Sequence, residues 1–292
     1  MIDSPLRGQR AGASLSVAVA QFAAIADVTS NISSLEFFAE AAAREGAEVV
    51  VFPEASMYSF NASAADIANC ARRDGEHFET AIRGLAARLG LVIIAGMYAD
   101  SGGPLARNVF IVAGPDGKRL GSYEKLHLYD AFHNRESEKS VRAPLLDDFA
   151  EACIFEYGGL RFGLMAAYDL RFPEMARVLI DRGANVLLVG ADWVSGPLKE
   201  LHWETLLRAR AIENTCFVAA SCQSPPLSVG MSMIVDPNGL PMATVAGDSG
   251  VAVARLSEAR LRSVREALPC LEHRRYRVGQ RDEAASAPLR MT

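Results

Sequence analysis

The sequence lacks any apolar run long enough to cross a membrane, although 50% of its 292 residues are hydrophobic. Residues 1–12 are polar with scattered arginines, and the apolar stretch that follows is short and has the pattern of a strand, not of a signal peptide. An excess of one charge is also missing, since 30 basic residues face 35 acidic ones without long runs. We therefore expect a cytoplasmic protein that binds neither nucleic acid nor a membrane.

Cysteine and histidine are few, and neither shows the spacing of metal ligands. The five cysteines are widely scattered with no C-x-x-C pair, and the five histidines show no H-x-x-x-H spacing. An odd number of dispersed cysteines argues against a disulfide framework and against a zinc site. Cys216 and Cys222 lie in or beside an apolar segment, where buried thiols are usually inert. We expect no metal and no cofactor.

Strand-like and helix-like patterns alternate through most of the chain. Between the predicted strands 14–21 and 49–52, apolar residues recur at helical spacing after a candidate cap at Ser30 or Asn31. Further helices are predicted to end at Gly90 and to cover residues 173–182 and 198–212, and further strands to cover 91–95, 108–112, 153–157, 161–166, 185–189, 216–221, 233–235 and 250–256.

The same pattern predicts an α/β fold in which layered sheets are covered by helices. No linker rich in Pro, Gly or Ser divides the chain, so we predict a single domain over residues 1–292. From about residue 257 the sequence becomes more polar, and we expect this C-terminal tail to extend away from the core. It includes Arg274, Arg275, Arg277 and Arg281.

Three segments place polar residues where apolar strands end. The segment VFPE puts Glu54 just past a strand, and YEKLHLY sets Lys125 among apolar neighbours. Taken alone, each segment has an equally good explanation without function: Glu54 as a solvated glutamate at a strand end, and Lys125 as a surface lysine on an edge strand. The third, GLMAAYDLRFPE at residues 163–174, is a strand followed by a polar turn, and Pro173 then opens a helix. A nucleophile belongs at the tip of such an elbow, but the residue there is Ala167.

In this order, the three segments resemble the nitrilase superfamily of carbon–nitrogen hydrolases. That family has Glu after a strand and Pro, Lys in a K-x-H-L segment, and Cys in an elbow of the form C-Y-D-x-R-F-P-E. Residues 191–194, the helix at 202–214 and the turn at 233–237 also fit the family pattern. The resemblance implies a four-layer α-β-β-α sandwich and a homodimer or larger homo-oligomer.

The resemblance also implies a role for each matching residue. Glu54 is the general base, Lys125 and the backbone N–H of Tyr168 stabilise the tetrahedral oxyanion, and position 167 is the nucleophile's place. Glu136 positions the lysine and the substrate, with Glu138 as the alternative because the alignment of this loop is uncertain. His127 is expected to make a structural hydrogen bond. Tyr168 and Trp193 are expected to line the pocket, and packing in the core is an equally good explanation for both.

The residues after position 167 indicate the branch of the family. Y-D-x-R-F-P-E is typical of its amidases, whereas nitrilases usually have C-W-E at the elbow and carbamoylases C-N-D. We therefore expect the parent enzyme to hydrolyse a small carboxamide to the acid and ammonia, with a nitrilase or an N-carbamoyl amino acid amidohydrolase as the alternative. The chain with Ala167 is predicted to be inactive. Either an engineered Cys-to-Ala change or a natural ligand-binding pseudoenzyme explains this, and we favour the first.

Overall fold

The computed structural model describes residues 12–245 and 247–280, which form two β-sheets packed face to face. The first sheet has the strand order β13-β1-β2-β3-β4-β5, with β6 beside β4. Its strands are β1 (Ser14–Gln21), β2 (Val49–Val51), β3 (Val92–Asp100), β4 (Ala106–Ala113), β5 (Arg119–Glu124), β6 (Ser140–Val141) and β13 (Gly250–Ser257).

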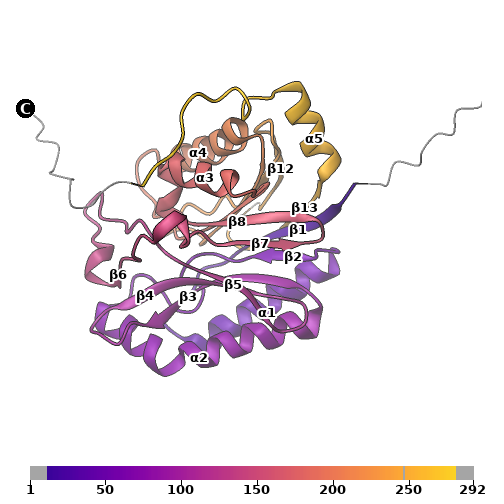
Figure 1. Cartoon of the computed structure of the whole chain (residues 1–292). Helices are drawn as coiled ribbons and strands as arrows, with labels where there is room; N and C mark the ends of the chain where they lie inside the picture. Colours follow the sequence, from indigo (N-terminus) through magenta and orange to yellow (C-terminus); the bar gives the residue numbers. More distant parts are fainter. Residues whose placement is uncertain (1–11, 246, 281–292) are drawn as a thin grey trace, which may run out of the picture.

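The second sheet has the order β12-β11-β10-β9-β8-β7. Its strands are β7 (Ile154–Tyr157), β8 (Leu160–Ala166), β9 (Val186–Ala191), β10 (Phe217–Cys222), β11 (Met233–Val235) and β12 (Pro241–Thr244). The helices are α1 (Val28–Arg44), α2 (Ala64–Leu89), α3 (Pro173–Asp181), α4 (Lys199–Asn214) and α5 (Glu258–Ala267). In Figure 1, α1 and α2 cover the first sheet and α3 and α4 cover the second, so the predicted four-layer sandwich is confirmed.

The alternating pattern of β1 shows why the sheets stack. Val17 and Val19 belong to the apolar cluster shared by the two sheets, whereas Ala18 and Ala20 belong to the cluster under α1 and α2. Successive side chains of a strand point to opposite faces, so a strand that is apolar throughout is buried on both. The strands pair in parallel from β1 through β2 to β3 and from β8 through β9 to β10, which brings their carboxyl ends to common edges.

The helix ends show one wrong and one correct prediction. The cap of α1 is Asp27, whose side chain accepts a hydrogen bond from the Ser30 N–H at 2.7 Å. Asn31, the other candidate, is buried inside the helix and donates to the Met57 carbonyl at 2.9 Å. The prediction that Ser30 or Asn31 caps the helix was therefore wrong. Gly90 ends α2 as predicted, with a φ of 68° that suits glycine.

Residues 257–280 of the C-terminal segment pack on the core, contrary to expectation. Helix α5 buries Leu261 and Val264, and Leu261, which is 4% exposed, belongs to the apolar cluster shared by the two sheets. Arg274 then forms an ion pair with Asp181 of α3 at 2.6 Å. The apolar side chains at one-turn spacing in α5 explain this packing. Arg281 and residues 1–11 lie outside the described residues.

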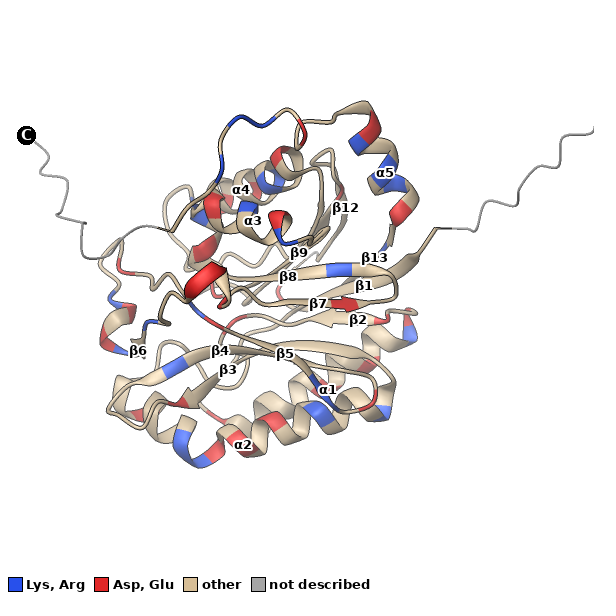
Figure 2. Cartoon of the chain, viewed as in Figure 1, with Lys and Arg blue, Asp and Glu red and all other residues tan. Residues whose placement is uncertain are grey.

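The composition of the helices bears on whether one of them could span a membrane. None of those within residues 12–245 and 247–280 has both the length and the apolar character of a membrane span. In Figure 2, acidic and basic residues are both present along α2 and α4. This mixture agrees with the small net charge of −5.

Candidate active site

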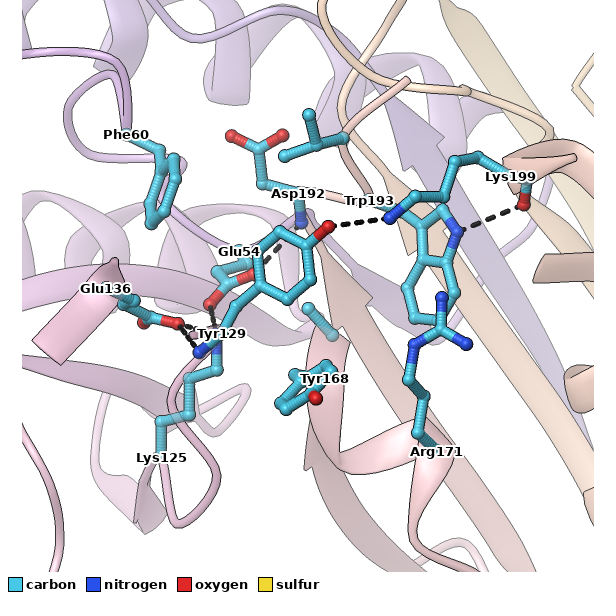
Figure 3. A pocket seen from close by; sticks show the side chains of 12 residues that line it. Glu54, Phe60, Lys125, Tyr129, Glu136, Tyr168, Arg171, Asp192, Trp193 and Lys199 are labelled. Carbon is cyan, nitrogen blue, oxygen red and sulfur yellow. Dashed lines mark hydrogen bonds and ion pairs between the residues drawn. The ribbon is translucent and has the colours of Figure 1, made fainter. Parts of the chain in front are cut away.

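A cavity lies where strands from both sheets end. Glu54 follows β2, Lys125 follows β5, and Ala167 follows β8, so three segments far apart in the sequence meet here. The space between its lining residues is about 320 Å³ and includes a part that is open to solvent. Its lining residues, most of them labelled in Figure 3, are Glu54, Phe60, Lys125, Tyr129, Glu136, Ala167, Tyr168, Arg171, Asp192, Trp193, Val194 and Lys199.

Two buried carboxylates hold the lysine between them. Lys125 Nζ donates to Glu54 Oε1 and to Glu136 Oε2, both at 2.7 Å. Glu54 is 1% exposed, Lys125 2% and Glu136 0%. The alternatives of a solvated glutamate and a surface lysine were therefore wrong. Glu138, the alternative to Glu136, is exposed, so the geometry favours Glu136.

The environment shifts the pKa of the first carboxyl and of the lysine. Burial raises the pKa of Glu54 to about 7, and the Lys125 ammonium opposes part of this shift. Burial alone would lower the pKa of Lys125, but the two carboxylates more than offset it and hold the pKa above its usual range. Near neutral pH the lysine is therefore charged, while Glu54 can both accept and release a proton. Such a balance suits acid–base catalysis.

Asn108 completes the cluster, and the sequence analysis did not single it out. Its amide donates to Glu54 Oε1 at 2.7 Å and to Glu136 Oε1 at 3.0 Å. Backbone N–H groups of Tyr129 and Asp192 donate to Glu136 at 2.7 Å and to Glu54 at 3.0 Å. A polar amide at the start of the apolar run of β4 was the signal that could have identified Asn108. Since both carboxylates are anchored by several donors, their geometry is fixed before any substrate binds.

The elbow after β8 has the predicted order of strand, turn and helix. Residues Ala167–Arg171 form a 3₁₀ turn, and α3 then begins at Pro173 as predicted. Ala167 is 4% exposed and has a φ of 32°, a backbone conformation that residues other than glycine rarely adopt. Such strain at a strand–turn junction is typical of functional positions.

Asp169 joins the elbow to the lysine segment. Its Oδ2 accepts hydrogen bonds from the Tyr123 hydroxyl at 2.6 Å and from the Ala166 N–H at 2.8 Å. Its Oδ1 lies 2.7 Å from His127 Nδ1, which confirms the expected structural hydrogen bond of the histidine. The fully buried carboxylate thus fixes Ala167 relative to Lys125.

Tyr168 and Trp193 both line the cavity and both pack against other rings. The Tyr168 ring lies 5.2 Å from that of Tyr129, and the Trp193 ring lies 5.4 Å from that of Trp203. Trp193 Nε1 donates to the Lys199 carbonyl at 3.1 Å. Tyr168 and Trp193 therefore both line the pocket and pack against neighbouring rings, so each of the two explanations applies to both residues.

None of the five cysteines of the chain lines the cavity. Burial raises the pKa of Cys153 and of Cys216 to about 12. The thiolate forms of these residues are scarce at neutral pH, so they are poor nucleophiles. Within the described part of the chain, no group of three or more His, Cys, Asp or Glu residues could hold a metal ion.

The sequence matches the carbon–nitrogen hydrolase family over residues 16–266, which is most of the chain. The chain belongs to this family. It is 41% identical over 170 residues to the deaminated glutathione amidase of Escherichia coli O157:H7, an alignment that covers 57% of this chain and 62% of that protein. It is 33% identical over 247 residues to the 2-oxoglutaramate amidase of Bacillus subtilis, covering 83% of this chain and 90% of that protein.

Solved structures of the family have the same fold. The NitFhit protein of C. elegans superimposes with a TM-score of 0.82 and 28% identity over 91% of this chain and 66% of that one. A cysteine-to-alanine mutant of the Nesterenkonia AN1 amidase from the nitrilase superfamily gives a TM-score of 0.76 and 25% identity, covering 90% of this chain and 98% of that one. The chain thus spans about two thirds of the first protein's length and nearly all of the second.

Proposed function

We propose that the parent form of this protein is an amidase that carries cysteine at position 167 and hydrolyses a small carboxamide to a carboxylic acid and ammonia. The observation that carries the proposal is the buried cluster of Glu54, Lys125 and Glu136, which lines the same cavity as the tip of the elbow. A base, a fixed cation and a strained nucleophile position are the three components that acyl transfer from nitrogen requires.

In the proposed reaction, Glu54 accepts and returns the proton in each step. Glu54 takes the thiol proton of the cysteine at 167, and the thiolate sulfur forms a bond to the amide carbon. The oxyanion that develops lies against the Lys125 ammonium and the Tyr168 N–H. When the C–N bond breaks, Glu54 returns the proton to the leaving ammonia and a thioester remains. Water then attacks the thioester with Glu54 as base, which releases the acid and restores the thiol.

Glu136 acts through the lysine in this scheme. Its carboxylate holds Lys125 Nζ at 2.7 Å and is itself fixed by the Tyr129 N–H. An ammonium that is already oriented needs no reorganisation when the oxyanion forms, which is the source of its catalytic effect. Glu136 is therefore a positioning residue.

We infer that the chain with Ala167 is an inactive Cys-to-Ala variant of this amidase. A methyl group can neither form nor release a thioester, and removal of a nucleophile costs several orders of magnitude in rate. The intact cluster and the elbow, with its φ of 32°, support this view, because nothing else in the site has been lost. Relative to the proposed cysteine form, the chain lacks only the sulfur atom at position 167.

The names of the relatives support a carboxamide as the substrate. The amidases of E. coli O157:H7 and B. subtilis are named for deaminated glutathione and 2-oxoglutaramate. Nitriles and N-carbamoyl amino acids are the alternative substrates within the same enzyme class. Parallel assays with an amide, a nitrile and an N-carbamoyl amino acid would separate them, because the preferred substrate class should give the highest kcat/KM.

The direct test is ammonia release by the Ala167→Cys variant. We expect it to hydrolyse small amides, while the unchanged chain and the double variant Ala167→Cys, Glu54→Gln remain at background or are at least ~10²-fold slower. The double variant keeps the thiol and removes only the base. Binding of amides by Ala167→Cys without any ammonia release would overturn the amidase proposal.

A second candidate function is a ligand-binding pseudoenzyme, and Ala167 itself is the observation that favours it. Codon 167 of the native gene separates the two, since cysteine supports the amidase and alanine the pseudoenzyme.

We also propose that residues 1–292 form one domain and that the protein is a cytoplasmic homodimer or larger homo-oligomer. Sedimentation velocity would test the assembly, and a monomer at micromolar concentration would contradict it.

A further inference from the structure

Asn108 is an uncharged side chain that contacts both carboxylates of the buried cluster. It lies on β4, is 1% exposed, and places its amide nitrogen 2.7 Å from Glu54 Oε1 and 3.0 Å from Glu136 Oε1. Both acceptors are carboxylate oxygens, so the NH₂ group faces them and Oδ1 faces away. Asn108 does not line the cavity, and the proposed reaction gives it no role. Its place in the cluster therefore needs a separate explanation.

The orientation of the Asn108 amide is unfavourable for the asparagine itself. Its Oδ1 is buried and has no hydrogen-bond partner among the described residues. The residue opposite Asn108 in the antiparallel pairing of β3 and β4 is Tyr98, whose buried hydroxyl also lacks a partner within that part of the chain. A buried acceptor without a hydrogen bond costs free energy. The contacts with the two carboxylates must offset this cost, so they determine how the amide is oriented.

The two carboxylate oxygens of Glu54 have different numbers of donors. Oε1 accepts hydrogen bonds from the Lys125 ammonium and from the Asn108 amide, both at 2.7 Å. Oε2 accepts from the Asp192 N–H at 3.0 Å and from no other donor of the described residues (Figure 3). An oxygen that already holds two donors is the poorer proton acceptor, because a new proton would have to displace one of them. A proton that comes from the cavity therefore goes to Oε2.

The charged groups that face Glu54 come from three other segments of the chain. Lys125 follows β5, Glu136 lies in the 3₁₀ turn Glu136–Glu138, and Asp192 follows β9. Burial and the charge of Glu136 raise the pKa of Glu54, whereas the Lys125 ammonium lowers it. Burial also raises the pKa of three further neighbours, which therefore stay neutral near pH 7: Tyr98, Tyr123 and Cys222. Asn108 adds a hydrogen bond to the Glu54 anion without adding a charge.

We propose that Asn108 is a positioning residue for the base: its amide occupies Glu54 Oε1 and stabilises the carboxylate, so that Glu54 takes the thiol proton on Oε2. In this step the S–H bond of the cysteine at 167 breaks, its electron pair stays on sulfur, and an O–H bond forms at Oε2. The same proton passes from Oε2 to the leaving nitrogen when the C–N bond breaks. This inference rests on the proposed amidase function and deepens it, and Asn108 acts only through Glu54.

Carbon-13 NMR of the side-chain carboxyl groups tests the inference without any turnover. The chain with Ala167 is labelled at its glutamate carboxyls and titrated with acid and base, and Glu54 is identified by the signal that Glu54→Gln removes. We expect a midpoint for Glu54 that matches its pKa of about 7. Asn108→Leu, which has a similar volume and no donor, should raise this midpoint by about one to two pH units, because a hydrogen bond to a charged group is lost. An unchanged or lower midpoint would overturn the inference.

The same substitution has a kinetic signature in the Ala167→Cys background. With butyramide as substrate, Asn108→Leu should lower kcat/KM for ammonia release by about 10- to 100-fold at pH 6 and by no more than about twofold at pH 9, because the acidic limb of the profile moves with Glu54. A residue with a purely structural role would lower kcat/KM by the same factor at both pH values. Such a uniform loss would contradict the assigned role of Asn108.

A second buried asparagine, Asn214, provides the matched control. It is 0% exposed, its Oδ1 also has no partner among the described residues, and its amide donates to the Arg210 carbonyl at 3.0 Å, away from the cavity lining. Asn214→Leu should therefore leave the Glu54 midpoint in place, and an equal shift in this variant would show that the effect is not specific to Asn108. Asn108→Ala is measured as well, because it removes the donor without adding an apolar side chain. It should raise the midpoint in the same direction, and thermal unfolding shows which variants are folded.

The outcomes separate this inference from the function on which it rests. If Asn108→Leu and Asn108→Ala both left the Glu54 midpoint unchanged, the inference would be wrong and the amidase proposal would stand. If Ala167→Cys released no ammonia from any amide, the amidase function would be wrong. The NMR titration would still show in that case whether Asn108 stabilises the Glu54 anion, because it needs no activity.

Discussion

Replacement of Lys125 by methionine removes the only cation between two buried carboxylates of the described site. The chain as given is suitable for this experiment, because the effect concerns stability and needs no activity. Lys125 makes two charge-assisted hydrogen bonds of 2.7 Å, to Glu54 and to Glu136. Methionine has a similar volume and keeps the apolar part of the side chain, so the charge is the main loss.

The expected loss is large and depends on pH. Breaking a buried ion pair by removing one partner typically costs about 3–5 kcal/mol. In the chain that keeps Lys125, the pKa of this lysine is raised above 10.5, its value in the unfolded chain. The stabilisation of the fold by the Lys125 charge is therefore present below pH 10.5 and is lost only as the pH rises further. In the variant, the pKa of Glu54 remains raised by burial and loses the opposing charge of Lys125, so folded Glu54 holds a proton that the unfolded chain releases above its ordinary pKa. Stability therefore falls as the pH rises, by ~1.4 kcal/mol per pH unit for this retained proton.

Urea unfolding at pH 5 and pH 8 measures this effect. We expect Lys125→Met to lose about 3–5 kcal/mol at pH 8 and clearly less at pH 5. Lys118→Met is the matched control, because its exposed pair with Asp116 is worth less than about 1 kcal/mol. If Lys125→Met lost no more than the control at pH 8, or became more stable as the pH rose, the account of the cluster would be refuted.

Two more predictions concern the base and the sheet packing. In the Ala167→Cys variant, kcat/KM for ammonia release should fall about tenfold per pH unit below pH 7, because Glu54, with a pKa of about 7, must be deprotonated to act as base. A flat profile from pH 5 to 8 would exclude Glu54 from this role. A Cβ at Gly190 would overlap the Phe110 ring, so Gly190→Ala should destabilise the fold by about 1–3 kcal/mol in thermal unfolding. Gly84→Ala, in open space on α2, should be neutral or stabilising by up to ~1 kcal/mol, and equal stability of the two variants would contradict the close packing of the sheets.

The sequence predicts the layers of this fold well, because the central strands β2, β9 and β10 are almost entirely apolar. Strand β1 was predicted with the bounds that the structure has, and the elbow after β8 was located to the residue. Continuous burial on both faces leaves a clear pattern in one short segment. The helix caps were less predictable, since Asp27, Ser30 and Asn31 are all good capping residues and lie within four positions of one another.

The residues of the site could be predicted only where they belong to a family motif. Glu54, Lys125 and position 167 stand in segments that resemble a known family, and the structure brings all three to one cavity. Asn108 was missed because its importance depends on neighbours far away in the sequence. It is 54 residues from Glu54 and 28 residues from Glu136. No local pattern encodes such contacts.

Mass spectrometry of Ala167→Cys, quenched during turnover of a small amide, shows whether position 167 is the place of the nucleophile. We expect a mass increase equal to one acyl group, located on the peptide that contains residue 167. The chain as given is the control, because it contains five native cysteines and must show no adduct under the same conditions. An adduct on one of those cysteines, or ammonia release with no adduct at residue 167, would contradict the account.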